Sequence, residues 1–306
     1  MYDFIGDVHG HADELEELFG KLGYSRRGET YSHPDRQAVF VGDLIDGGPK
    51  NRDVLQIVRA MVDRGTALAV MGNHEYNAIC YHTPDGNGGY LREHSQMNRQ
   101  QHQTTLKAFE GRDGELRDWI EWFKTLPLFL ELGGCRVVHA CWNNDEIARV
   151  MRQGPRVSEE FLLASSDKGR GEYKTVEELL KGPEIPLPDD GYFLDKDGHK
   201  RTAVRIRWWD DPAGKTYGEF GIGAAGHVST PLPERFVTAR SPYPAYAPPV
   251  FFGHYWFTGP PTLQTPNVCC LDCSVARGGH LVAYRWNGER VLNPDGFEAV
   301  PARSSH

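Results

Sequence analysis

Residues 2–10 read YDFIGDVHG, a short apolar run that ends at a carboxylate. Residues 11–22 follow with apolar side chains at helical spacing. The alternation continues with an apolar run at 38–41, a helical pattern at 53–62 and a third apolar run at 67–71. Strand, helix, strand, helix and strand with short connections predict an α/β fold with a parallel sheet and helices on its faces. In such a sheet, the carboxyl ends of the strands carry the functional site.

The rest of the chain is expected to complete a single domain over residues 1–300. A polar, helical stretch at about 81–125 predicts a helical cap insertion, and a Pro/Gly-rich stretch at about 150–200 predicts an irregular polar insertion. From about Ala203 onward, β-like runs predict a second sheet that packs on the first. These runs are AVRIRWW, RFV, PPVFFGH, NVCCLD and LVAYRW.

Composition limits the classes of function. The 306 residues include 34 Lys and Arg against 42 Asp and Glu, a formal charge of −8, which argues against general nucleic-acid binding. No apolar run approaches the roughly 20 residues of a membrane helix, and the first residues lack a signal-peptide pattern, so a cytoplasmic location without membrane attachment is expected. The six cysteines are expected to be buried, reduced thiols, with a redox or zinc role for Cys270 and Cys273 as the alternative.

Five segments place Asp, His or Asn directly after an apolar, strand-like run. One such residue can simply cap a helix or form a turn. Five in succession indicate a functional site at one edge of the sheet. The segments are GDVHG (6–10), GDLID (42–46), GNHE (72–75), VHA (138–140) and GHY (253–255).

These residues match the needs of a two-metal site. Asp7 and His9 can reach one ion, and the two oxygens of Asp43 can bridge both ions. Oxygen and nitrogen ligands favour Mn²⁺, with Fe or Zn²⁺ as alternatives. Two ions about 3.5–4 Å apart lower the pKa of a bridging water and stabilise an in-line displacement at phosphorus. The second ion is expected to be completed by Asn73, His139 and His254, with His227 as a competitor for the last position.

The order of GDVHG, GDLID, GNHE, a lone strand-end His and FGH over residues 6–254 resembles the calcineurin-like metallophosphoesterases. The resemblance implies a four-layer α/β/β/α sandwich, the six metal ligands named above, and attack by a metal-bridging hydroxide. It also implies that His74 protonates the leaving oxygen or stabilises the phosphorane, and that Asp46 orients His74.

Within that superfamily, the sequence is similar to the phosphoprotein-phosphatase branch and its bacterial relatives, the symmetrical diadenosine tetraphosphate hydrolases. The segments WIEWFKTLPLFLEL, FGHYW and CLDCSVARGGHLVAYRW carry this similarity. It implies a phosphohydrolase of dinucleoside polyphosphates or related nucleotides. A Ser/Thr phosphoprotein phosphatase is the alternative, a non-catalytic phosphate-binding scaffold is a minor one, and no obligate protein partner is evident.

One departure concerns the cation that holds the phosphate. The branch usually has an Arg after the GDxxD motif, whereas this chain has Gly47. Tyr255, with its aromatic neighbours, is a candidate platform for a nucleobase, as are Trp208 and Trp209. Most other histidines, among them His102, are expected at the surface or in turns, although His11 lies near the first motif. Candidates for the missing cation are Arg52, Arg92, Arg205 and Arg207.

Overall fold

A computed structural model describes most of the chain and divides it into two compact units. One unit comprises Met1–Lys181 and Pro248–His306, and the other comprises Gly182–Ala247. The single domain expected over 1–300 stays a prediction. His227, the competing metal ligand, lies outside the described residues. The described residues are 1–28, 30–152, 154, 156–188, 191–194, 198, 200–223 and 228–303.

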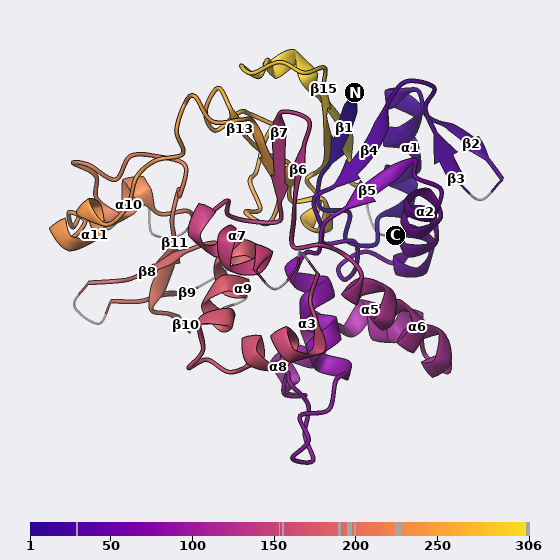
Figure 1. Ribbon diagram of the computed structural model, residues 1–306, viewed down its shortest axis with the longest axis horizontal. Helices are drawn as coiled ribbons and strands as arrows, with labels where there is room; N and C mark the ends of the chain where they lie inside the picture. The colour runs from indigo at the N-terminus through magenta and orange to yellow at the C-terminus, as the bar shows by residue number, and fades with distance from the viewer. Residues whose placement is uncertain are drawn as a thin grey trace. The chain divides into compact units, whose positions relative to one another are not determined.

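The first unit is built on the parallel strands that the sequence predicts. Strands β1 (Tyr2–Ile5), β4 (Gln37–Phe40) and β5 (Ala67–Ala69) lie side by side in that order, all parallel (Figure 1). Helix α1 (Ala12–Leu22) packs against the two strands at 280–286 and 297–301, which belong to the same sheet. Helix α2 (Asn51–Asp63) packs against β5. The predicted strand and helix alternation is therefore confirmed, and it brings the ends of β1, β4 and β5 to one edge.

The C-terminal strands are divided between two sheets, which differs from the expectation of one added layer. Strand β15 (His280–Trp286) pairs antiparallel with β1 and places Tyr284 opposite Phe4. Strands β14 (Asp272–Cys273) and β16 (Phe297–Pro301) pair with β15. Apolar strands suit either sheet, so the sequence pattern does not distinguish them. The second sheet has the order β13 (Val268–Cys270), β12 (Val250–Phe252), β7 (Cys135–Val138), β6 (Phe129–Leu132).

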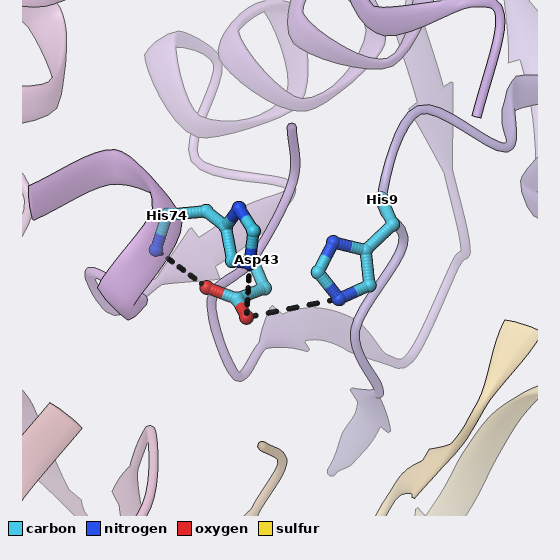
Figure 2. A group of neighbouring side chains, drawn as sticks. All are labelled: His9, Asp43 and His74. Carbon is cyan, nitrogen blue, oxygen red and sulfur yellow. Dashed lines mark hydrogen bonds and ion pairs between the residues drawn. The ribbon is translucent and has the colours of Figure 1, made fainter. Parts of the chain in front are cut away.

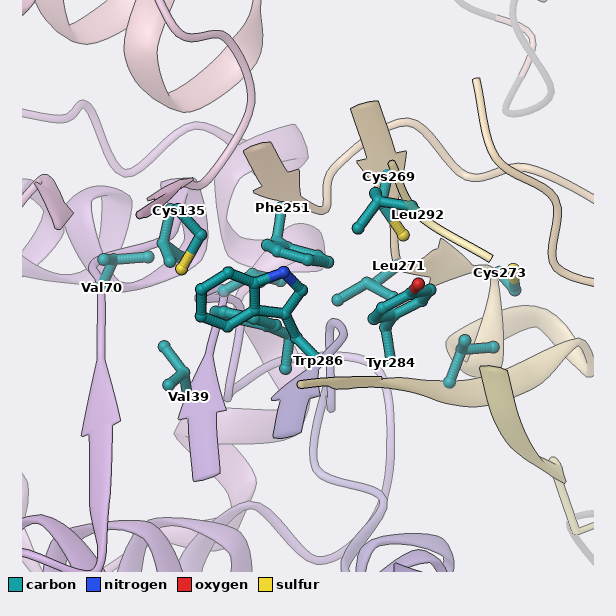
Figure 3. Packing of buried hydrophobic residues seen from close by; sticks show 14 residues of the cluster. Val39, Val70, Cys135, Phe251, Cys269, Leu271, Cys273, Tyr284, Trp286 and Leu292 are labelled. Carbon is teal, nitrogen blue, oxygen red and sulfur yellow. The ribbon is translucent and has the colours of Figure 1, made fainter. Parts of the chain in front are cut away.

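The core lies between these two sheets. The rings of Phe4 on β1 and Phe251 on β12 stack with centroids 3.8 Å apart. Tyr284 and Trp286 from β15 belong to the same buried cluster, together with Cys269 (Figure 3). Aromatic side chains from both sheets thus bury their faces against one another, which confirms the α/β sandwich.

Helices form over both insertions that the sequence predicts. The first insertion begins in α3 (Asn73–His82) and continues through α4, α5 and α6, of which α6 packs on α3. The stretch at about 150–200, expected to be polar and irregular with short helices such as one at 176–180, contains α8 (Glu159–Ser166) and α9 (Gly171–Lys181). Other helices of this unit are α4 (Gln96–Gln101), α5 (Gln103–Ala108), α6 (Asp113–Lys124) and α7 (Asn144–Met151), and its remaining short elements are β2 (Ser25–Arg27), β3 (Thr30–Ser32), η2 (Val275–Arg277) and η3 (Pro294–Gly296).

The second unit has a small core of its own. Strand β11 pairs with β8, and Ile185, Val204 and Phe220 are buried between its elements. The RFV run, expected to be a strand, lies in α11, where Pro233 is the N-terminal cap. Three residues are too few to show a period, so the sequence pattern did not distinguish a helix from a strand. The elements are β8 (Glu184–Pro186), β9 (Phe193–Leu194), β10 (Lys200–Arg201), β11 (Ala203–Arg205), α10 (Tyr217–Phe220) and α11 (Glu234–Thr238). Across the described parts of both units, no helix combines the length and the apolar character needed to cross a membrane.

Candidate metal centre

The ends of the strands bring the six predicted ligands together. Asp7 and His9 follow β1, Asp43 follows β4, and Asn73 begins α3 after β5. His139 follows β7 and His254 follows β12, so both sheets contribute. All six side chains are buried. Their assembly is observed, and their role as ligands stays a prediction.

Four residues of the site have a left-handed backbone conformation. The φ angles are 46° for His9, 52° for Asp43, 66° for Asp46 and 75° for His254. For residues other than glycine, this region costs about 1–3 kcal/mol each, and such strain concentrates at functional sites. The loops after three different strands therefore hold strained positions that aim these side chains toward one another.

Asp43 lies at the middle of the site. Its Oδ2 atom is 3.3 Å from Nε2 of His139, 3.7 Å from Nε2 of His9 and 3.9 Å from Nε2 of His74. Figure 2 shows Asp43 between His9 and His74. Two groups of side chains that could each hold a metal ion share Asp43: it combines with His9 and His74 in one and with His139 and His254 in the other.

Backbone carbonyls orient two of the histidines. Nδ1 of His9 lies 3.0 Å from the carbonyl of Ile45, and Nδ1 of His139 lies 2.8 Å from the carbonyl of Val41. A ring nitrogen can approach a carbonyl this closely when it carries the proton, which leaves Nε2 as the basic atom in the neutral ring. Metal-binding histidines show this arrangement.

The buried polar atoms of the site fit a bound cation. Oδ1 of Asp7, Nε2 of His9 and Oδ2 of Asp43 have no hydrogen-bond partner among the described residues. Burying such atoms unsatisfied costs several kcal/mol, and a metal ion would compensate each of them. The absence of a side chain at Gly253 allows the loop after β12 to approach Asp7, since a Cβ atom at Gly253 would lie 1.8 Å from Oδ1 of Asp7.

The charges of the Asp7 and Asp43 carboxylates also favour a bound cation. Burial, with repulsion from Asp272 and Asp43, raises the pKa of Asp7 well above its usual value. For Asp43, burial would raise the pKa, but attraction to His139 and His74 outweighs it and lowers the pKa well below the usual value. Two buried carboxylates that repel each other favour a positive charge between them.

His74 and Asp46 form a hydrogen-bonded pair beside this cluster. Nδ1 of His74 lies 2.7 Å from Oδ2 of Asp46. Burial lowers the pKa of His74, but attraction to Asp43 and the hydrogen bond to Asp46 outweigh it and raise this pKa to about 9. In the metal-free protein the imidazole is therefore protonated at neutral pH, which is the state from which a general acid acts.

The sequence interpretation missed other residues of the site. His102, expected at the surface or in a turn, is buried, and its Nδ1 lies 3.1 Å from Oδ1 of Asp46. The Glu75 carboxylate accepts hydrogen bonds from the backbone amides of Gly72, Asp43 and Leu44. Glu75 belongs to the GNHE motif and was a visible signal, whereas His102 lies in a polar helical stretch that carries none.

The two candidate arginines of the first unit have different partners. Arg52 forms a bidentate ion pair with Glu115, in which Nε donates to Oε1 at 3.0 Å and Nη2 donates to Oε2 at 3.1 Å. Arg92 is partly buried, and although burial lowers its pKa, the charge of Asp46 acts on it in the opposite direction. Its Nη2 donates a hydrogen bond of 2.6 Å to Oε1 of Gln101, so Arg92 lies beside the end of α4 and within electrostatic range of Asp46.

The remaining substrate candidates lie in different surroundings. Arg205 and Arg207 belong to the second unit, as do Trp208 and Trp209, whose buried rings contact each other edge to face. Tyr255 is buried, with its ring 5.7 Å from that of His254. The ring of the neighbouring residue, Trp256, is 5.7 Å from that of His9, so an aromatic side chain does border the candidate metal centre.

Comparison with known families agrees with this arrangement. Residues 2–211 match the model of the calcineurin-like phosphoesterases. The chain belongs to this family. Members of the family bind two metal ions, and the side-chain groups that share Asp43 provide places for them.

Several curated relatives are named bis(5'-nucleosyl)-tetraphosphatase PrpE (asymmetrical). The protein from Oceanobacillus iheyensis is 36% identical over 139 residues, which is 45% of this chain and 54% of that protein. The protein from Bacillus velezensis is 32% identical over 174 residues, 53% and 63% of the two chains. The matches thus cover less than two thirds of these relatives. Their name specifies asymmetrical cleavage, whereas the sequence resembled the symmetrical group.

A solved structure shares the fold. A protein serine/threonine phosphatase from Saccharomyces cerevisiae aligns with a TM-score of 0.51 and 14% identity, over 100% of this chain and 80% of that one. This similarity concerns the phosphoesterase fold alone.

Proposed function

We propose that this phosphoesterase is a metal-dependent hydrolase that cleaves a phosphoanhydride or phosphoester bond, with a dinucleoside polyphosphate as substrate. The observation that carries the proposal is the position of Asp43, whose Oδ2 faces the buried imidazoles of His9 and His139 and the partly buried imidazole of His74 at 3.3–3.9 Å and has no hydrogen-bond partner among the described residues. The names of the curated relatives support the nucleotide substrate.

We propose Asp7, His9 and Asp43 as ligands of one ion, and Asp43, Asn73, His139 and His254 as ligands of the second. When bound, such ions supply Lewis acidity that activates water and offsets the charge of the phosphate. Oxygen and nitrogen donors without a thiolate favour Mn²⁺, with Fe and Zn²⁺ as alternatives. His74 also lies within one geometric group, but its Nδ1 is held by Asp46, and its raised pKa favours a proton over a metal.

The proposed role of His74 is to deliver a proton to the leaving oxygen. Nδ1 carries the proton shared with Asp46, which leaves Nε2–H to face the reacting group. Asp46 keeps the ring oriented and compensates its charge while the proton is transferred. Arg92 is the proposed phosphate-binding cation of the first unit. The electrostatic influence of Asp46 on its guanidinium supports this proposal.

We also propose a cytoplasmic location and turnover without an obligate protein partner. The six cysteines are all free and buried, which fits a reducing compartment.

The decisive experiment compares substrates on the Mn²⁺-loaded protein. Diadenosine tetraphosphate and a panel of phosphopeptides are assayed for kcat/KM, and nucleotide products are separated by chromatography. The proposal predicts a preference for the nucleotide. Equal amounts of ATP and AMP would indicate asymmetrical cleavage, and ADP alone would indicate symmetrical cleavage. A preference for phosphopeptides would instead establish a phosphoprotein phosphatase.

Two variants separate metal binding from acid catalysis. Asp43→Asn removes a shared ligand and is expected to lose both bound metal and activity. His74→Asn is expected to retain the wild-type metal content, measured by elemental analysis, while kcat falls by about 10²–10⁴-fold. Full activity in His74→Asn would contradict the assigned role, and loss of metal from it would make His74 a ligand.

A further inference from the structure

Both oxygens of the Asp46 carboxylate are engaged by side chains. Oδ2 receives His74, as described above. Oδ1 accepts a hydrogen bond of 2.5 Å from the hydroxyl of Thr105 and lies 3.1 Å from Nδ1 of His102. The backbone amide of Asp46 donates to Oδ1 of Asn51 at 2.8 Å. Nδ1 of His102 also lies 3.3 Å from Oδ2, so Thr105 and His102 hold the carboxylate together with His74.

The side chains of His102 and Thr105 come from one short segment of the helical insertion. Each of the two residues is 1% exposed. His102 lies between α4 and α5, and Thr105 lies within α5. Between them, the hydroxyl of Thr104 accepts a hydrogen bond of 2.9 Å from the amide of Gly47. Residues 102–105 therefore bind two consecutive residues of the loop after β4, including the position where related phosphatases carry an Arg.

We propose that His102 and Thr105 are positioning residues that hold Asp46 in the orientation that aligns His74. This inference rests on the proposed role of His74 as the acid. Asp46 has a strained backbone with φ 66°, and its carboxylate torsion is intrinsically broad. Two donors on Oδ1 select the rotamer in which Oδ2 reaches the ring. The helical insertion thus supplies the side chains that support the His74–Asp46 pair.

A second histidine extends the arrangement. Nε2 of His82, at the end of α3, lies 3.2 Å from Nε2 of His102. Because Nδ1 of His102 must donate to the carboxylate, Nε2 of a neutral His102 is the acceptor, and His82 donates. His82 thereby favours the His102 tautomer that can bind Asp46. A chain of polar contacts runs from α3 through His102 to Asp46 and His74.

Aryl phosphates with different leaving groups test the proposal on the Mn²⁺-loaded protein. Phenolate is a poor leaving group that needs a proton, whereas 4-nitrophenolate needs one far less. We expect Thr105→Val and His102→Gln to reduce kcat for phenyl phosphate by about tenfold or more, and for 4-nitrophenyl phosphate by less than about threefold. Thr105→Ser should restore the wild-type ratio. An unchanged ratio in both variants would overturn the proposal.

Matched controls come from the same insertion. Thr83→Val removes a hydroxyl that bonds to the carbonyl of Ile79, and His94→Gln removes a ring that faces the carbonyl of Tyr81. Neither contact involves Asp46, so both variants should keep the wild-type ratio. In an Asp46→Asn background, Thr105→Val should cause no further loss on phenyl phosphate, because residues that act through one group are not additive. A further tenfold loss there would contradict the positioning role.

A measurement without turnover separates this inference from the proposed function. In the metal-free protein, the ring N–H of His74 that faces Asp46 is expected to give a protected NMR signal. Thr105→Val should increase its exchange with water, while Thr83→Val should leave it unchanged. A wild-type protein that hydrolyses neither the aryl phosphates nor diadenosine tetraphosphate would refute the proposed function, whereas an active protein with an unchanged His74 signal in Thr105→Val would refute the positioning role alone.

Discussion

The carboxylate of Asp7 accepts a hydrogen bond of 2.8 Å from the backbone amide of His254, which lies 247 residues further along the chain. This contact joins the first motif of the sequence to the last, and it links the sheet that contains β1 to the sheet that contains β12. The face-to-face packing of the two sheets is therefore what completes the candidate metal centre.

Gly253 is expected to be essential for this junction. In Gly253→Ala, the new methyl group would lie 1.8 Å from Oδ1 of Asp7, so the two loops must move apart. We expect the free energy of unfolding to fall by about 1–3 kcal/mol and bound Mn²⁺ to be lost. Gly20→Ala is the control, because no described atom lies within 4 Å of its Cβ position and alanine favours a helix. Wild-type metal content in Gly253→Ala would contradict the prediction.

The pKa of His74 predicts a pH dependence of the metal-free protein. In the folded state this pKa is raised from 6.5 to about 9, so protonated His74 stabilises the fold. The stabilisation is fully present below about pH 6.5 and is lost as the pH rises through about 9. An NMR titration of the ring should give a midpoint near 9 in the wild type and a lower one in Asp46→Asn. A wild-type midpoint at or below 6.5 would be incompatible with the pair as described.

The parts of the fold and site that follow from local patterns were predicted from the sequence. Apolar runs that end at Asp7 and Asp43 specify strand ends, and parallel strands bring such ends together. The partner of β15 was not predictable, because an apolar strand fits either sheet. His102 was missed for a related reason: it meets Asp46 across 56 residues, and its polar helical surroundings have no periodicity that points to burial.

Glu75 is expected to hold the loop after β4 in place. Its Oε2 accepts hydrogen bonds from Gly72 and Asp43, and its Oε1 accepts from Leu44, all at 2.8–2.9 Å. Glu75→Gln would point amide hydrogens at backbone N–H groups, at a cost of about 1–3 kcal/mol in the free energy of unfolding. Glu177→Gln, which removes a partner of Lys181 on α9, is expected to cost less than about 1 kcal/mol. Urea denaturation measures both, and equal losses would rule out the anchoring role.

The cysteines are expected to be inert in the folded protein. All six are buried, and burial raises the pKa of Cys80 to about 11 and the pKa values of Cys135 and Cys273 to about 12. Thiolates are therefore scarce at neutral pH. We expect no rapid reaction with a thiol reagent such as DTNB until the protein is unfolded, and then reaction at all six. Fast modification of Cys270 or Cys273 in the native protein would revive a redox role for that pair.

Arg92 and Arg52 are expected to differ in their effect on substrate binding. Arg92 is partly buried, is influenced by the charge of Asp46 and donates to the neutral side chain of Gln101, whereas the guanidinium of Arg52 forms an ion pair with the Glu115 carboxylate. A lost charge-assisted hydrogen bond to phosphate is worth about 1.5–3 kcal/mol, which corresponds to roughly a 10- to 100-fold change. We therefore expect Arg92→Ala to reduce kcat/KM for 4-nitrophenyl phosphate by that factor, and Arg52→Ala to change it by less than about threefold. If Arg52→Ala caused the larger loss, the phosphate would bind on the α2 side of the site, and the cation that replaces the Arg missing at Gly47 would be Arg52.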